Sequence, residues 1–279
     1  GATSYAVARG NAVPTTRTAG SGFSIRVYLV DRFFNIVKNM AYDGSQIEIT
    51  APVDTFKFAP PGFTANYSAT NGYAQFTNSI ILKKAVGDQY LKARFVNGTL
   101  PNPNFIGVNG NVDPPAGVSA SSFTAKAAGP QGIQVLMPWE AADPGRGDYS
   151  LCTGGNASQC GKGITSESAI SLSSQPSIFA GAAFTVKTRV VDQYFNTVKP
   201  SDQGWNCPSN PCPNVYLITS DNYDVSPATA EFTANGIQDF TGVTGVTLVS
   251  RSTSTTIYAK NEDGTGIPGG NNTPNFANR

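Results

Sequence analysis

The chain of 279 residues contains no histidine. Histidine is the commonest general base near neutral pH and the commonest zinc ligand, so its absence excludes histidine-based catalytic triads and the usual zinc sites. Charged residues are also scarce, at 13%, and the formal net charge is only +1. A nucleic-acid-binding protein would carry a clustered basic excess, which this chain lacks. We therefore expect no nucleic-acid partner.

Long apolar segments are missing as well. No apolar run reaches the length of about eighteen residues that a membrane-spanning helix needs. Helical periodicity is missing too, and the helix-disfavouring residues Gly, Pro, Thr and Ser are frequent throughout. The expected surface residues are Ser, Thr, Asn and Gly instead of charged residues, and this composition is found in secreted β proteins. The sequence therefore predicts an all-β fold, no membrane span and an extracellular or cell-surface location.

What the chain does contain is one stretch that is used twice. Residues 19–38 align without a gap with residues 180–199, at an offset of 161, and nine of the twenty positions are identical. Self-similarity at a fixed offset indicates a repeated structural unit. Apolar and polar residues alternate in both copies, which predicts a half-buried antiparallel strand in each. In the second copy this alternation puts Lys187 and Arg189 on the solvent side.

Each repeated strand runs into a corner that contains an aspartate, aromatic residues and an asparagine. These polar residues are Asp31 and Asn35 in the first copy and Asp192 and Asn196 in the second. Asp and Asn side chains bond nearby backbone groups, and Asn tolerates positive φ. We expect all four residues to be structural, with each aspartate bonding the backbone of its own corner. Replacing Asp192 with Ala should then cost about 1–3 kcal/mol of stability.

The strand and its corner together resemble the repeated immunoglobulin-like modules of bacterial surface proteins, the invasin-type and filamin-like repeats. The resemblance extends over most of both halves and is specific over the twenty residues of the repeat. It implies two tandem immunoglobulin-like antiparallel β-sandwiches, an extracellular structural role and no catalytic residue. The step from Gly129 to Pro130 marks the junction, so the predicted domains are residues 1–128 and 129–279.

Further strands are predicted from short alternating segments in both units. In the first unit they are residues 3–9, 46–50, 55–58, 74–77, 79–82, 90–96 and 121–127. In the second unit they are residues 133–137, 216–219, 230–233 and 257–260, where 230–233 is aligned with 74–77.

The four cysteines, Cys152, Cys160, Cys207 and Cys212, lie in connections that are longer than their counterparts in the first unit. A metal site is the alternative, but these spacings without histidine fit zinc poorly. We expect two local disulfides, 152–160 and 207–212, that stiffen exposed loops. Two such pairs indicate an oxidising compartment.

Calcium is the one cofactor that the acidic residues suggest. The candidate ligands Asp113, Asp221, Asp224 and Asp263 lie in turns, and hard cations bind clustered oxygens on turns. None of them has the spacing of an EF-hand loop, and aspartates in turns often only form the turn. The tripeptide Arg-Gly-Asp at 146–148 is a cell-adhesion motif, although Gly-rich turns also produce such triplets by chance.

The predicted function is that of a non-enzymatic structural subunit of an extracellular filament or cell-surface array. Its expected partners are other copies of the chain, in head-to-tail contact. The alternative is a secreted carbohydrate-binding or adhesion module that binds glycans or a host surface. Two tryptophans and eleven tyrosines offer aromatic faces for sugar stacking, but such residues also pack in cores and on sheet faces.

The closing strand of the first unit, residues 121–127, has no counterpart in the sequence of the second unit. By alignment its closing strand would fall about twenty-three residues after Gly264, beyond Arg279. An incomplete sandwich presents an open edge, which a strand from another chain can fill by β-augmentation. We expect residues 3–9 of a neighbouring copy to do so, since a head-to-tail contact that does not close makes a filament. The alternatives are that the chain belongs to a longer repeat array, or that its own tail supplies the strand.

Overall fold

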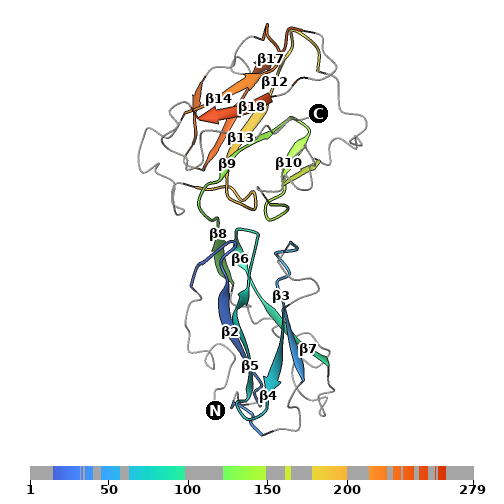
Figure 1. The fold of residues 1–279 in the computed structure, drawn as a ribbon, viewed down its shortest axis with the longest axis vertical. Coiled ribbons are helices and arrows are strands. Elements are labelled where there is room, and N and C mark those ends of the chain that lie inside the picture. Colours follow the sequence, from blue (N-terminus) through green and yellow to red (C-terminus); the bar gives the residue numbers. More distant parts are fainter. Residues whose placement is uncertain are drawn as a thin grey trace. The chain divides into compact units, whose positions relative to one another are not determined.

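A computed structural model of the chain describes residues 15–31, 33, 35–39, 45–56, 63–97, 122–148, 161–164, 178–199, 214–224, 229–233, 235–241, 245–250, 255 and 257–261. These residues form strands and turns without a helix (Figure 1), which confirms the all-β class. In this part of the chain no helix is long and apolar enough to cross a membrane. The chain divides into two compact units, Gly1–Lys126 and Ala127–Arg279, and the predicted junction lies close to this division.

The first unit contains two sheets. A five-stranded sheet has the order β2-β5-β4-β3-β7, and a three-stranded sheet has the order β1-β8-β6. β1 and β8 pair in parallel, whereas the other pairs of this unit are antiparallel. The bounds are β1 (Arg17–Thr18), β2 (Phe23–Tyr28), β3 (Gln46–Thr50), β4 (Phe63–Ser68), β5 (Tyr73–Ile80), β6 (Val86–Gln89), β7 (Lys92–Asn97) and β8 (Phe123–Lys126).

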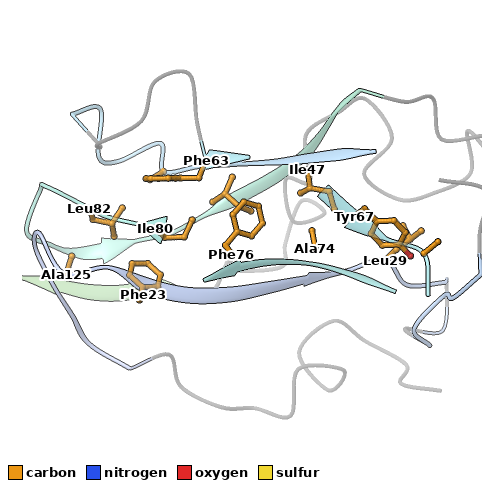
Figure 2. Packing of buried hydrophobic residues seen from close by; sticks show 13 residues of the cluster. Phe23, Leu29, Ile47, Phe63, Tyr67, Ala74, Phe76, Ile80, Leu82 and Ala125 are labelled. Atoms are coloured by element: carbon orange, nitrogen blue, oxygen red, sulfur yellow. The ribbon is translucent and has the colours of Figure 1, made fainter. Parts of the chain in front are cut away.

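The five-stranded sheet curls around the core of the first unit. β4 makes the curl possible, because its first half pairs with β3 and its end pairs with β5. Figure 2 shows β2 and β5 on one side of the buried side chains and β3 on the other, with Phe76 between them. The predicted alternation of β2 is confirmed: Phe23 is buried, whereas Ser24, Arg26 and Tyr28 alternate with it on the outer face.

The second unit contains the three-stranded sheets β16-β13-β9 and β15-β14-β18 and the two-stranded sheets β12-β17 and β10-β11. Its described strand pairs are all antiparallel. The bounds are β9 (Gly132–Leu136), β10 (Glu140–Ala142), β11 (Lys162–Ile164), β12 (Ala183–Phe184), β13 (Val186–Val191), β14 (Asn214–Thr219), β15 (Ala230–Glu231), β16 (Ile237–Phe240), β17 (Val246–Thr247) and β18 (Ile257–Asn261).

The strand pairs correct the alignment of the two units. The predicted match of residues 230–233 with 74–77 is wrong, because β15 pairs with β14 as β4 pairs with β3. The counterpart of β5 is β16, which pairs with the repeated strand β13 as β5 pairs with β2. In these pairs Gln238 takes the place of Ala74, an offset of 164 (238 − 74), close to the 161 of the repeat. The corrected match therefore lies closer to the offset of the repeat than the predicted one, which was 156 (230 − 74).

Other strand predictions differ from the structure in detail. The predicted strand at 55–58 is wrong in its described part, since Thr55 and Phe56 belong to a turn. Segment 74–77 and the first part of segment 79–82 belong to the single strand β5, and β1, β4, β6, β10, β11, β16 and β17 were not predicted. The predicted strand at 3–9 lies outside the described residues.

Candidate functional site

A corner built on Asp192 follows β13 in the second unit. Oδ1 of this carboxylate accepts the amides of Tyr194 (2.8 Å) and Asn196 (2.9 Å). Oδ2 accepts the side-chain amide of Asn196 (2.8 Å) and the backbone amide of Ala128 (2.9 Å). Burial raises the pKa of the fully buried Asp192, and the hydrogen bond from the Asn196 side chain opposes that rise. Four donors on two oxygens fit the ionised carboxylate, which therefore holds the corner as an acceptor.

The residue with positive φ in this corner is Phe195 (φ 60°), whereas Asn196 was the residue expected to tolerate such a conformation. Left-handed backbone is costly for a large aromatic residue and persists only where the surroundings enforce it. Here the Phe195 side chain is completely buried, and the Phe195 amide donates to the Asp192 carbonyl (3.1 Å). Packing and hydrogen bonds together hold the strained residue in place.

The first unit builds the same corner on Asp31. Its Oδ1 accepts the amides of Phe33 (2.8 Å) and Asn35 (2.9 Å), and its Oδ2 accepts the Asn35 side chain (2.9 Å). The bond from the Asn35 side chain lowers the pKa of Asp31. Unlike its counterpart, this corner lies at the surface, and Phe33 is 49% exposed. The repeat therefore preserves the hydrogen bonds while the burial of the corner differs.

A second pair of aspartates fastens distant segments in each unit. Asp54 is completely buried, and its Oδ2 accepts the amides of Lys83 (2.6 Å) and Lys84 (3.1 Å). Asp221 in the second unit does the same with the amides of Val249 and Ser250, both at 2.7 Å. Each aspartate follows the strand β3 or β14 and anchors the chain beyond β5 or β17. The anchoring role of Asp54 was not predicted from the sequence, and Asp221 was predicted only as a candidate calcium ligand.

The Asp221 anchor predicts a specific loss of stability in acid. The amide of Ser250 is the main cause that lowers the pKa of Asp221, from 3.8 to about 2. Because the folded pKa lies below the unfolded one, the carboxylate stabilises the fold above about pH 4, and this contribution is lost as the pH falls towards 2. We expect Asp221→Asn to be less stable than the wild type at pH 6, and the difference to shrink between pH 4 and 2. Urea unfolding across this range measures it; a difference independent of pH would contradict the anchor.

Of the other candidate calcium ligands, one lies in the same turn as Asp221 and two lie outside the described residues. Asp224 stands in the same turn as Asp221, where its Oδ2 accepts the Thr219 hydroxyl (2.5 Å). Asp113 and Asp263 lie outside the described residues. Within those residues no group of three or more acidic or cysteine side chains is placed to hold a metal ion. Calcium binding therefore stays a prediction, and its described ligands already bond protein donors.

The four cysteines lie outside the described residues, whereas the Arg-Gly-Asp tripeptide lies within them. The cysteines concerned are Cys152, Cys160, Cys207 and Cys212. The tripeptide at 146–148 lies in a turn, where Arg146 forms an ion pair with Asp143 (3.1 Å) and Asp148 accepts the Gln193 side chain (3.0 Å). Both charged side chains of the tripeptide thus have partners within the chain.

A hairpin and a buried arginine occupy the outer face of β13. The prediction that Arg189 lies in water is wrong, because this side chain is only 5% exposed. Its guanidinium donates to the Gln134 side chain (2.8 Å), the Thr197 hydroxyl (3.0 Å) and the Phe195 carbonyl (3.4 Å). Burial lowers the pKa of Arg189 to about 10, and the charge of Asp192 opposes this shift, so the group stays protonated at neutral pH.

The hairpin β10–β11 joins this buried network through Gly161. The Gly161 carbonyl accepts the Gln134 side chain (3.1 Å) and the Asp143 amide (2.7 Å). A buried ion pair between Lys162 and Glu140 (2.9 Å) ties the two strands together, and burial lowers the pKa of Lys162. The hairpin belongs to the insertion that the first unit lacks. The hairpin is therefore joined to the Arg189 part of the polar face of β13, whereas Lys187 on the same face stays exposed, as predicted.

The first unit leaves the equivalent face open. Tyr28, which stands at the position of Arg189, is 42% exposed and packs edge-on against Tyr73, with ring centroids 5.4 Å apart. Arg26 lies over the Tyr73 ring (5.1 Å) and donates to the Gln75 side chain (3.1 Å). Two aromatic rings bordered by an arginine and an amide thus form an exposed polar–aromatic patch on β2 and β5.

Most of the polar side chains described above form hydrogen bonds that hold the backbone in place. The exposed patch on β2 and β5 is the exception. Comparison with known proteins adds no further assignment: no family model, no curated protein and no solved structure matches the chain.

Proposed function

We propose that the chain is a non-enzymatic structural subunit of an extracellular filament or cell-surface array, which assembles head-to-tail through β-strand contacts. The observation that carries this proposal is the use of the buried acids. Asp54, Asp192 and Asp221 each accept backbone amides from two segments. Active sites instead keep perturbed acids available to a substrate. A chain that uses three buried aspartates to fasten its backbone is built to be rigid.

The proposal includes two tandem immunoglobulin-like sandwiches. In the first unit the sheets β1-β8-β6 and β2-β5-β4-β3-β7 support this assignment. In the second unit the sheets β16-β13-β9 and β15-β14-β18 repeat the β2–β5, β3–β4 and β3–β7 pairs of the first unit. Two packed antiparallel sheets formed by short strands are the hallmark of such sandwiches. Local disulfides at Cys152–Cys160 and Cys207–Cys212 would suit the same extracellular setting.

Assembly of the purified full-length chain tests the proposed function. We expect regular filaments or arrays in negative-stain electron micrographs, and a sedimentation coefficient that grows with protein concentration. A chain that stays monomeric at every concentration from micromolar to millimolar would contradict the proposal.

A carbohydrate-binding module is the second candidate, and the exposed patch of Tyr28, Tyr73, Arg26 and Gln75 favours it. Aromatic faces beside hydrogen-bonding groups are suited to sugar rings. A glycan array distinguishes the two candidates. Binding to one polysaccharide that Tyr28→Ala abolishes, in a protein that does not assemble, would support the carbohydrate-binding module.

A further inference from the structure

The first unit shows how its last strand is held beside β1. The turn after β1 is fixed by two backbone bonds, from the Gly20 amide to the Leu82 carbonyl (2.7 Å) and from the Ser21 amide to the Thr18 carbonyl (3.1 Å). On the other side of β1 lies β8, in parallel register, and the Ala19 amide donates to the Lys126 carbonyl (2.9 Å). β8 thereby fills the position between β1 and β6.

Two side chains of β8 face the inside of the first unit. Ala125 is 2% exposed and belongs to the core cluster that Figure 2 shows. Phe123 is half-buried and packs edge-on against Phe23, with ring centroids 6.1 Å apart. A strand in this position thus needs an aromatic residue and, two residues later, a small or medium apolar residue.

The second unit repeats the turn without a described strand beside it. The Gly181 amide donates to the Leu248 carbonyl (2.8 Å), and the Ala182 amide donates to the Phe179 carbonyl (3.1 Å). The two donors and the Phe179 acceptor match those of the first unit at the offset of 161, and Leu248 takes the place of Leu82 at an offset of 166 (248 − 82). Among the residues that the structure describes, however, no strand pairs with residues 178–180, and Phe179 is 76% exposed.

The segment of residues 3–9 has a sequence that fits the pattern of β8. Residues 3–9 read Thr-Ser-Tyr-Ala-Val-Ala-Arg, and residues 121–127 read Ser-Ser-Phe-Thr-Ala-Lys-Ala. In this alignment Tyr5 takes the place of Phe123, and Val7 takes the place of the buried Ala125. The sequence Phe-Ala-Asn-Arg at 276–279 also offers an aromatic residue, but it puts Asn278 at the buried position, where an unpaired amide is costly.

We propose that the edge at residues 178–180 accepts residues 3–9 of a second copy as a parallel strand. By the register of the first unit, Val7 would lie opposite Ile178 and Ala8 opposite Phe179, with Tyr5 and Val7 turned inward. This assignment rests on the proposed function and names the two surfaces through which copies join. Each copy offers one donor segment and one acceptor edge, so the contact is heterologous and propagates.

Peptide binding in trans tests the assignment independently of filament formation. A fluorescent peptide of residues 1–10 is titrated against the chain that lacks those residues, and anisotropy reports saturable binding. We expect Val7→Asp in the peptide and Phe179→Lys in the protein each to weaken binding about tenfold or more, because a buried charge and a charged edge both oppose strand addition. Tyr223→Lys is the matched control, since Tyr223 is 73% exposed in the same unit, and it should leave binding unchanged.

Three results would overturn the assignment: no binding, binding that Phe179→Lys does not weaken, or binding that appears only after residues 262–279 are removed. The last result would show that the tail of the same chain holds the position. If the chain binds the peptide specifically but never assembles, the acceptor edge at residues 178–180 is supported and the proposed filament function is wrong. Assembly that persists after deletion of residues 1–10 would support the filament and show that residues 3–9 are not the donor strand.

Discussion

Replacing Asp192 with Ala should lower the free energy of unfolding by about 3–5 kcal/mol, more than the 1–3 kcal/mol expected from the corner motif alone. The substitution leaves four N–H donors without their acceptor, and one of them, the Ala128 amide, comes from outside the corner. It also removes the negative charge that favours the protonated form of the buried Arg189. Urea unfolding of the full-length chain, followed by circular dichroism, measures the loss.

The equivalent change in the first unit is the matched control. Asp31→Ala removes the same three corner bonds, but water can replace them because this corner lies at the surface. We expect a much smaller loss of stability than for Asp192→Ala. Equal losses for the two variants would show that burial and the Arg189 charge contribute nothing to the larger effect.

Gly161→Ala should be the second severe substitution, with a loss of about 2–4 kcal/mol. Gly161 has a φ of 61°, a backbone conformation that residues with a side chain rarely adopt. A Cβ atom there would lie 2.3 Å from Cβ and 2.4 Å from Cγ of Phe195, which is completely buried. Neither the ring nor its strained backbone can move away without disturbing the Asp192 corner. Thermal unfolding of the full-length variant measures the effect.

Gly163→Ala controls for the general effect of adding a methyl group to this hairpin. Gly163 lies two residues further along in β11, and a Cβ atom there meets nothing within 4 Å. We expect its stability to stay within about 0.5 kcal/mol of the wild type. If both glycine variants unfold like the wild type, the contact between the hairpin and Phe195 does not support the corner.

The repeated strand and corner could be predicted from the sequence because their determinants are local. Two-residue alternation sets the burial of Phe23 and the exposure of Tyr28, and the bonds that Asp31 and Asp192 accept within their own corners span two to four residues. The pattern is therefore visible within a window of twenty residues. The all-β class follows from the same short periodicity.

The anchors and the covered face could not be predicted, because their partners are distant in the sequence. Asp54 accepts amides 29 and 30 residues away, and Arg189 reaches Gln134 across 55 residues. The sequence of β13 contains no sign that Arg189 joins a buried network with a hairpin while Lys187 on the same face stays exposed. The wrong alignment of residues 230–233 has a related cause. It was based on the similarity of four residues to residues 74–77, whereas the true counterpart is identified only by which strands pair.

The parallel pairing of β1 with β8 has a mechanical consequence. β1 opens the described part of the first unit and β8 closes it, so a pulling force along the chain enters near one and leaves near the other. In a parallel pair these two points lie at opposite ends of the contact. Tension therefore shears all of its hydrogen bonds at once, including the bond from Ala19 to Lys126, whereas an antiparallel terminal pair would be peeled apart one bond at a time. We therefore expect the first unit to resist a force that pulls its two ends apart along the chain.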